Sequence, residues 1–178
     1  MLNRNFKTVM LGWLMGSTSV GTNDIRFNQH TIYNVGGGSV GYPPSEGATT
    51  NQLSKAIVNA LNATTTNNTI ARQSKQRLFM AVGTGTTEAT AEDYTLESEN
   101  TNITCEAITQ TYTQSYKRQI TATFNNPTAQ DITLKEVGLF YETYINDDYS
   151  INTIMLAREN IEVTIPSGES KAITMEIG

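Results

Sequence analysis

The residues with the clearest chemical potential lie in the stretch VGTGTTEATAEDYTLESE, residues 82–99, where two glycines separate an apolar run from an acidic segment. A strand, a glycine loop and a helix in that order can cradle phosphate groups. A P-loop also needs a lysine, which this loop lacks, and a dinucleotide fingerprint needs a third glycine at the helix start. The acidic residues would repel a polyanion. We therefore expect Gly83 and Gly85 to be turn glycines at the end of a strand, with the acidic segment connecting two strands.

Other residues that could carry chemistry are few or scattered. The single histidine, His30, excludes a His-rich metal site and any Ser-His-Asp set that does not use it. The single cysteine, Cys105, cannot form an internal disulfide, and we expect it to pack as a small apolar residue. Asp147 and Asp148 are too few ligands for calcium, and no apolar pocket is evident for a pair of catalytic carboxylates. We expect no enzyme activity, no metal and no cofactor.

Length and charge narrow the possible partners. The chain has 178 residues and a net charge of −5, which fits one domain or a domain with an attachment arm. Nucleic-acid binding depends on clustered Lys and Arg, so an acidic chain indicates no nucleic acid partner. The apolar run at 9–15 resembles a weak secretory signal but is too short to span a bilayer, and we expect no membrane contact.

Residues 1–74 are predicted to form an N-terminal arm with one or two helices, for attachment or oligomerisation. The best helix is 50–62, where Leu53, Ile57 and Leu61 recur every four residues. The stretch VGGGSVGYPPSEG, residues 35–47, is typical of a flexible connection. A second, short helix at 1–16 would carry the candidate partner-binding residues Phe6, Met10, Trp13 and Leu14 on one side. The alternative for this apolar group is docking against the protein's own sheet.

Residues 75–178 are predicted to form an antiparallel β-sandwich of about seven to eight strands, because the apolar period changes from 3.6 to 2 near residue 75. Ile132 and Leu134 are out of phase with Val137 and Leu139, so we expect a bulge near Lys135 or Glu136. The other expected strands are 77–82, 103–112, 116–124, 153–158, 161–165 and 171–177.

Two features of this β domain bear on how strands pair. In PSGES, residues 166–170, Pro166 fixes one backbone angle and the turn glycine Gly168 can take a positive φ, so we expect the last two strands to form a hairpin. Glu136 is flanked by apolar residues and Arg158 ends an apolar strand. We expect these two to form a partly buried structural ion pair that fixes strand register; the alternative is two solvated charges that contribute little.

Three phrases together resemble a domain that recurs in virion proteins of tailed bacteriophages. They are the stretch at 82–99, ITATFNNPTAQDITLKEVGLFYE at 120–142, and IMLARENIEVTIPSGESKAITMEI at 154–177. In that family a strand enters a GxGxT turn, an acidic DYxLES segment follows, an EVGLF strand crosses the sheet, and a PxGE turn precedes the final strand. The opening LNRNF is also similar to the start of such proteins.

The resemblance implies a non-enzymatic virion structural protein, most simply an auxiliary capsid-decoration or head-fibre protein bound through its arm. The alternatives are a tail, neck or baseplate accessory protein, or a receptor- or carbohydrate-binding module in which Tyr141, Tyr144 and Tyr149 would stack on sugars. The expected partners are capsid, portal or tail proteins. We also expect a homo-oligomer, since weak contacts add up when many copies sit on a symmetric particle.

Overall fold

The structure, a computed structural model, describes residues 32–33, 35–37, 39–40, 65–66, 76–112, 118–144 and 151–177. These residues form antiparallel strands and no helix, which confirms the prediction of a mainly β chain. The strands are β1 (Ile32–Tyr33), β2 (Ser39–Val40), β3 (Thr65–Thr66), β4 (Gln76–Gly83), β5 (Thr104–Tyr112), β6 (Arg118–Asn125), β7 (Ile132–Tyr144), β8 (Ile151–Ile165) and β9 (Ser170–Ile177).

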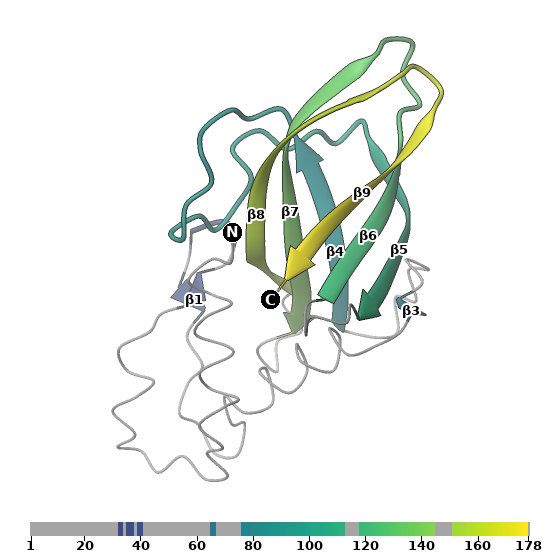
Figure 1. The fold of residues 1–178 in the computed structure, drawn as a ribbon. Helices are drawn as coiled ribbons and strands as arrows, with labels where there is room; N and C mark the ends of the chain where they lie inside the picture. Colours follow the sequence, from purple (N-terminus) through teal and green to yellow (C-terminus); the bar gives the residue numbers. More distant parts are fainter. Residues whose placement is uncertain are drawn as a thin grey trace, which may run out of the picture.

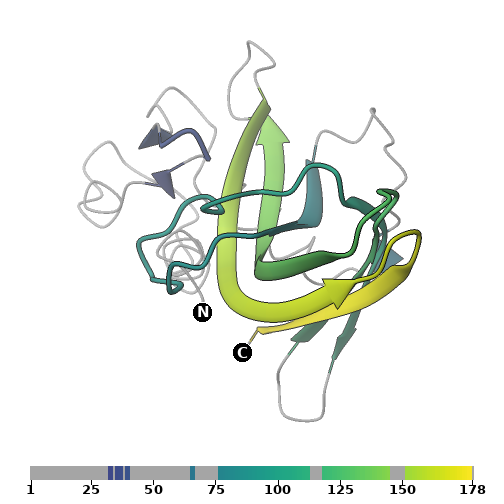
Figure 2. The same ribbon diagram turned by 90° about the horizontal axis from the view of Figure 1, so that it is seen from above.

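Two of the sheets form layers around one hydrophobic core. A three-stranded sheet has the order β4-β7-β8, and a four-stranded sheet has the order β3-β5-β6-β9 (Figure 1). Their facing side chains belong to one cluster, in which Leu139 and Ile154 of the first sheet join Ile120, Phe124 and Met175 of the second. Viewed from above, β7 and β8 run side by side and bend together, so that the second half of β8 lies beside β9 (Figure 2).

Alternation with period two explains the inward face of the four-stranded sheet. Every second residue of β6 is buried, including Ile120, Ala122 and Phe124. The second half of β9 repeats the pattern with Ile173, Met175 and Ile177. Because successive side chains of a strand point to opposite faces, this pattern directs the apolar residues of both strands into the core.

The pairing of β7 with β8 includes a register shift between Leu134 and Glu136, at the position expected for a bulge. The prediction of two separate strands at 153–158 and 161–165 is wrong, because β8 is continuous from Ile151 to Ile165. Polar residues suggested a break there. In the structure Arg158 and Asn160 remain paired with Gly138 and Glu136 of β7 while their side chains bond to a loop outside the sheet.

The predicted hairpin between the last two strands is also wrong, because β8 pairs with β7 whereas β9 pairs with β6 in the other sheet. Gly168 does have the expected positive φ, 72°. The buried Asn126 supports this crossing: its Nδ2 donates to the carbonyl oxygens of Gln130 at 2.8 Å and Ile165 at 2.9 Å. The residue types at 166–170 therefore predict the turn, but they do not determine which sheet the next strand joins.

Parts of the predicted arm contribute strands. Strand β1 precedes the stretch expected to be a flexible connection and pairs with β2, which lies within it, in a small hairpin in which Gly37 has a φ of 74°. The backbone N–H of Val35 donates to the carbonyl oxygen of Thr153 in β8 at 3.0 Å. Strand β3 pairs with β5 through Thr65 and Thr109. The predicted helices at 1–16 and 50–62, with the candidate anchor Phe6, Met10, Trp13 and Leu14, lie outside the described residues.

Candidate functional site

The segment 84–100, called the acidic loop below, follows β4 and folds back over the outer face of the three-stranded sheet. Its two ends are tied together, since the N–H of Thr84 donates to the carbonyl oxygen of Ser98 at 2.9 Å. The N–H of Asn100 then donates to the carbonyl oxygen of Val82 in β4 at 2.8 Å. Leu96 of the loop is buried against Phe140 and Met155 of the sheet. As expected, the acidic segment is a connection between strands, although it contains no helix.

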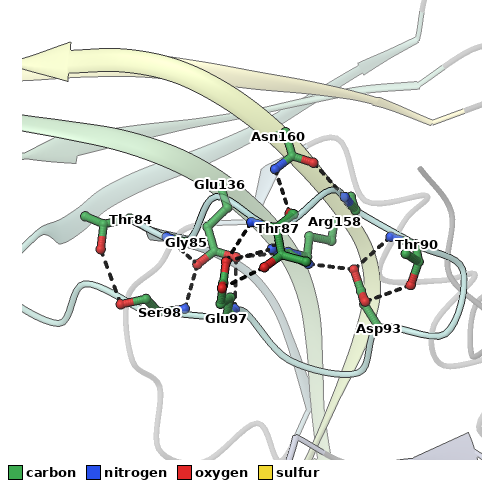
Figure 3. Close-up of polar contacts among 11 residues, drawn as sticks. Thr84, Gly85, Thr87, Thr90, Asp93, Glu97, Ser98, Glu136, Arg158 and Asn160 are labelled. Carbon is green, nitrogen blue, oxygen red and sulfur yellow. Dashed lines mark hydrogen bonds and ion pairs between the residues drawn. The ribbon is translucent and has the colours of Figure 1, made fainter.

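Glu136 of β7 is the centre of the contacts that hold this loop (Figure 3). Its side chain is fully buried, and its Oε1 accepts hydrogen bonds from the backbone N–H groups of Gly85 at 3.1 Å and Ser98 at 2.8 Å. Its Oε2 accepts from the backbone N–H of Glu97 at 3.0 Å and from Nε of Arg158 at 2.9 Å. One carboxylate of the sheet therefore binds both ends of the acidic loop.

Arg158 of β8 provides the second set of contacts. Besides the ion pair with Glu136, its Nη1 lies 2.7 Å from Oδ2 of Asp93, and its Nη2 donates to the carbonyl oxygen of Thr87 at 3.0 Å. Glu97 lies farther away, with its Oε2 3.9 Å from Nη2. The expected Glu136–Arg158 ion pair is thus present, and the loop residues Asp93 and Glu97 extend it. We call Asp93, Glu97, Glu136 and Arg158 the Arg158 network.

The network holds three carboxylates against one guanidinium, and hydrogen bonds from the loop compensate the excess negative charge. Desolvation raises the pKa of Asp93, but hydrogen bonds from Thr90 and the contact with Arg158 outweigh it and leave that pKa below its ordinary value. The Thr87 hydroxyl and N–H lower the pKa of the Glu97 carboxyl. Burial lowers the pKa of Arg158, but Asp93 and Glu136 outweigh it and the pKa lies above its ordinary value. These shifts keep Asp93, Glu97 and Arg158 ionised near neutral pH.

Gly83 and Gly85 lie beside this network for a reason different from the one expected. Among the described glycines, positive φ occurs at Gly37 and Gly168, so Gly83 and Gly85 are not required for a left-handed turn. A Cβ on Gly83 would lie 2.4 Å from Oε1 of Glu136, and one on Gly85 would lie 2.5 Å from the same atom. These glycines let the backbone approach a buried carboxylate closely.

The bonding of Glu136 favours a structural role over proton transfer. Each carboxylate oxygen can accept about two hydrogen bonds, and each oxygen of Glu136 already accepts two. A general base needs a free lone pair directed at a substrate. Within the described ranges, no group of three or more His, Cys, Asp and Glu residues is placed to hold a metal ion.

The structure tests some of the other site residues that were proposed from the sequence. Tyr141, one of three tyrosines considered for sugar stacking, is buried in the core, so that assignment is wrong for this residue. The loop with Asp147, Asp148 and Tyr149 lies outside the described residues. No helix among the residues described is long and apolar enough to cross a membrane.

Sequence reasoning missed the loop partners of Arg158. Asp93 and Glu97 were recognised only as members of an acidic segment, and Asn160 was treated as part of a strand break. Asn160 accepts a hydrogen bond from the N–H of Ala89 at 2.6 Å and donates to the carbonyl oxygen of Thr87 at 2.9 Å. The available signal was the pair of polar residues, Arg158 and Asn160, spaced two apart on one face of an apolar strand.

Comparisons with protein-family models, with curated proteins and with solved structures found no match to this chain.

Proposed function

We propose that this chain is a structural protein of a tailed-bacteriophage virion, an auxiliary decoration or head-fibre protein that binds the particle through its N-terminal arm. One observation carries the proposal: the three phrases that resemble virion proteins converge on the Arg158 network (Figure 3). The first phrase supplies Asp93 and Glu97, the second supplies Glu136 and the third supplies Arg158. The residues that carry the resemblance thus act together in one place.

The way these residues are used supports a structural function. Their charges are paired inside the molecule, where Glu136 is 0 % and Arg158 is 3 % exposed, so they are not presented to a substrate. They bond a surface loop to the sheet at several points. A preordered surface loses little conformational entropy on assembly, which favours packing against neighbouring proteins. The proposal therefore includes neither catalysis nor a cofactor.

The proposed partners are capsid, portal or tail proteins, together with further copies of this chain in a homo-oligomer. The arm would supply the main contact, through the apolar group Phe6, Met10, Trp13 and Leu14. Weak individual contacts suffice, because multivalent attachment to a symmetric particle raises the effective concentration of each additional contact. The proposal places the protein in the virion, with no nucleic acid or membrane partner.

The proposal is tested on purified virions of the phage whose genome encodes this chain. We expect mass spectrometry to detect the chain in many copies per particle and immunogold labelling to mark the head. Gold label confined to the tail would support the alternative of a tail accessory protein. Particles that lack the chain would refute the proposal.

The role of the arm is tested with two variants that add the same charge. Trp13→Asp removes the aromatic centre of the candidate anchor, whereas Thr8→Asp changes the opposite side of the predicted helix. We expect Trp13→Asp to reduce incorporation into particles strongly and Thr8→Asp to leave it near wild type. Equal incorporation of both variants, with unchanged thermal unfolding, would exclude this group as the anchor.

A further inference from the structure

Two exposed apolar side chains come from different segments of the chain and lie close together. Among the residues that the structure describes, Val35 and Tyr94 are the large apolar side chains that remain exposed, at 37 % and 40 %. Val35 lies in the turn of the small hairpin, and Tyr94 lies in the acidic loop. A Cβ built on Gly37, in the same turn as Val35, would lie 3.3 Å from the hydroxyl oxygen of Tyr94. Single apolar residues on a surface are ordinary, whereas a pair from two segments marks a candidate interaction site.

Both segments are fixed to strand β8. The backbone N–H of Val35 donates to the carbonyl oxygen of Thr153 at 3.0 Å. In the acidic loop, Asp93 precedes Tyr94, and its Oδ2 lies 2.7 Å from Nη1 of Arg158. Figures 1 and 2 both show the hairpin and the acidic loop on the β8 side of the molecule. An exposed pair that is held in place before binding loses little conformational entropy when a partner docks.

The surroundings of this apolar pair are negatively charged. The acidic loop contains five acidic residues and neither lysine nor arginine. Glu88, Glu92 and Glu99 of this loop are exposed. The positive charge of Arg158 lies inside the molecule, because its side chain is 3 % exposed and paired with carboxylates. A partner of complementary charge is therefore cationic.

We infer that Val35, Tyr94 and the acidic loop form a docking surface for an arginine-bearing segment of another virion protein. A guanidinium group is planar, so it can stack on an aromatic ring and donate paired hydrogen bonds to a carboxylate. Tyr94 supplies the ring, and the exposed glutamates supply the carboxylates. Val35 supplies an apolar contact for the aliphatic part of the segment. Lysine would match the charge, but it lacks the planar fork that both of these contacts use.

The identity of the partner as a virion protein rests on the proposed function, whereas the chemistry of the docking surface does not. The surface also gives the Arg158 network a positioning role. By bonding the acidic loop to the sheet, the network holds Tyr94 beside the hairpin.

The chemistry is tested with a defined probe, the peptide acetyl-Gly-Arg-Leu-Arg-Gly-amide. It is titrated into the full chain, labelled for NMR, at physiological salt. We expect the backbone amide signals of Val35, Gly37 and Tyr94 to shift, and the same peptide with lysine in place of arginine to bind more weakly. Absence of binding, shifts that centre on β6 and β9, or equal binding of a peptide with glutamate in place of arginine would each overturn the inference.

Variants of the chain separate the contribution of the ring from that of the charge. Tyr94→Phe keeps the ring and should bind the arginine peptide like the wild type, whereas Tyr94→Leu should bind it about two- to fivefold more weakly. Glu92→Gln should weaken binding by up to about fivefold. Glu176→Gln removes the same charge from the exposed side of β9 and should leave binding unchanged. Thermal unfolding is the control for folding, and equal affinities of all four variants would contradict the inference.

Photo-crosslinking in purified virions tests the partner. Tyr94→p-benzoylphenylalanine keeps an aromatic ring at the docking surface. After digestion at glutamate residues, we expect a crosslinked peptide from a second kind of virion protein, with the link next to an arginine. A crosslink to another copy of this chain, or no crosslink, would overturn the assignment of the partner. Absence of the chain from virions would instead refute the proposed function, while the peptide titration would still decide whether the docking surface exists.

Discussion

Loss of the arginine from the Arg158 network should destabilise the protein strongly. Arg158→Met keeps most of the side-chain volume but leaves the Glu136 carboxyl group fully buried and without its ion-pair partner. Breaking a buried pair in this way costs about 3 to 5 kcal/mol. We expect a loss near the lower end, because Glu136 keeps three backbone N–H donors. A domain with a total stability of about 5 to 15 kcal/mol would remain largely folded.

Urea unfolding at neutral pH measures this loss, and the chain offers a matched control. Lys135 and Glu162 form another ion pair between β7 and β8, at 2.8 Å, but 79 % of the Glu162 side chain is exposed. Exposed pairs contribute little, so Lys135→Met should change stability much less. Equal losses for Arg158→Met and Lys135→Met would refute the importance of the buried network.

Replacing both Glu136 and Arg158 should not restore the stability of the wild type. If the two residues formed only a simple ion pair, replacing both could restore it. Glu136→Leu also leaves the N–H groups of Gly85, Glu97 and Ser98 without their acceptor. A buried donor left unsatisfied costs about 1 to 3 kcal/mol. We therefore expect Glu136→Leu with Arg158→Met to remain well below wild type in urea unfolding, and a double variant as stable as the wild type would contradict the observed bonding.

Three further predictions concern the same region. Leu96→Ala should cost about 2 to 3 kcal/mol in urea unfolding by opening a cavity over the sheet and should speed proteolysis within the acidic loop; unchanged cleavage would contradict its role. Gly83→Ala should lower the thermal midpoint more than Gly168→Asn, because a Cβ at Gly83 would lie 2.4 Å from Glu136 whereas nothing lies within 4 Å at Gly168; the reverse order would be inconsistent with close approach. Because the folded-state pKa values of Asp93 and Glu97 are lowered, their stabilisation is present above the ordinary carboxyl pKa and disappears as pH falls through the folded values. The free energy of unfolding should thus decrease as the pH drops below about 4, and this decrease should be less steep in the Asp93→Asn variant. Identical pH profiles for the variant and the wild type would show that Asp93 contributes nothing.

Local patterns in the sequence were sufficient where one strand determines the outcome. Alternation in β6 and β9 identified their buried faces, and the change of phase between Leu134 and Val137 located the register shift. The Glu136–Arg158 ion pair could be predicted from the sequence because an arginine in an apolar strand needs a buried partner.

Contacts between distant segments could not be obtained in this way. Asp93 and Arg158 are 65 residues apart in sequence, and neither has a local signal that names the other. The turn at Gly168 is compatible both with a hairpin and with a crossing from one sheet to the other. The role of Gly85 depends on a carboxylate 51 residues away, so its type suggested a turn and concealed the close approach.

Amide hydrogen exchange under native conditions tests most directly whether the Arg158 network locks the acidic loop. The N–H groups of Gly85, Glu97 and Ser98 bond to a buried carboxylate, so we expect them to be protected to nearly the same degree as those of the core strand β6. Rapid exchange at these three positions, as in an ordinary surface loop, would contradict a locked loop and remove the main structural support for the proposed virion role.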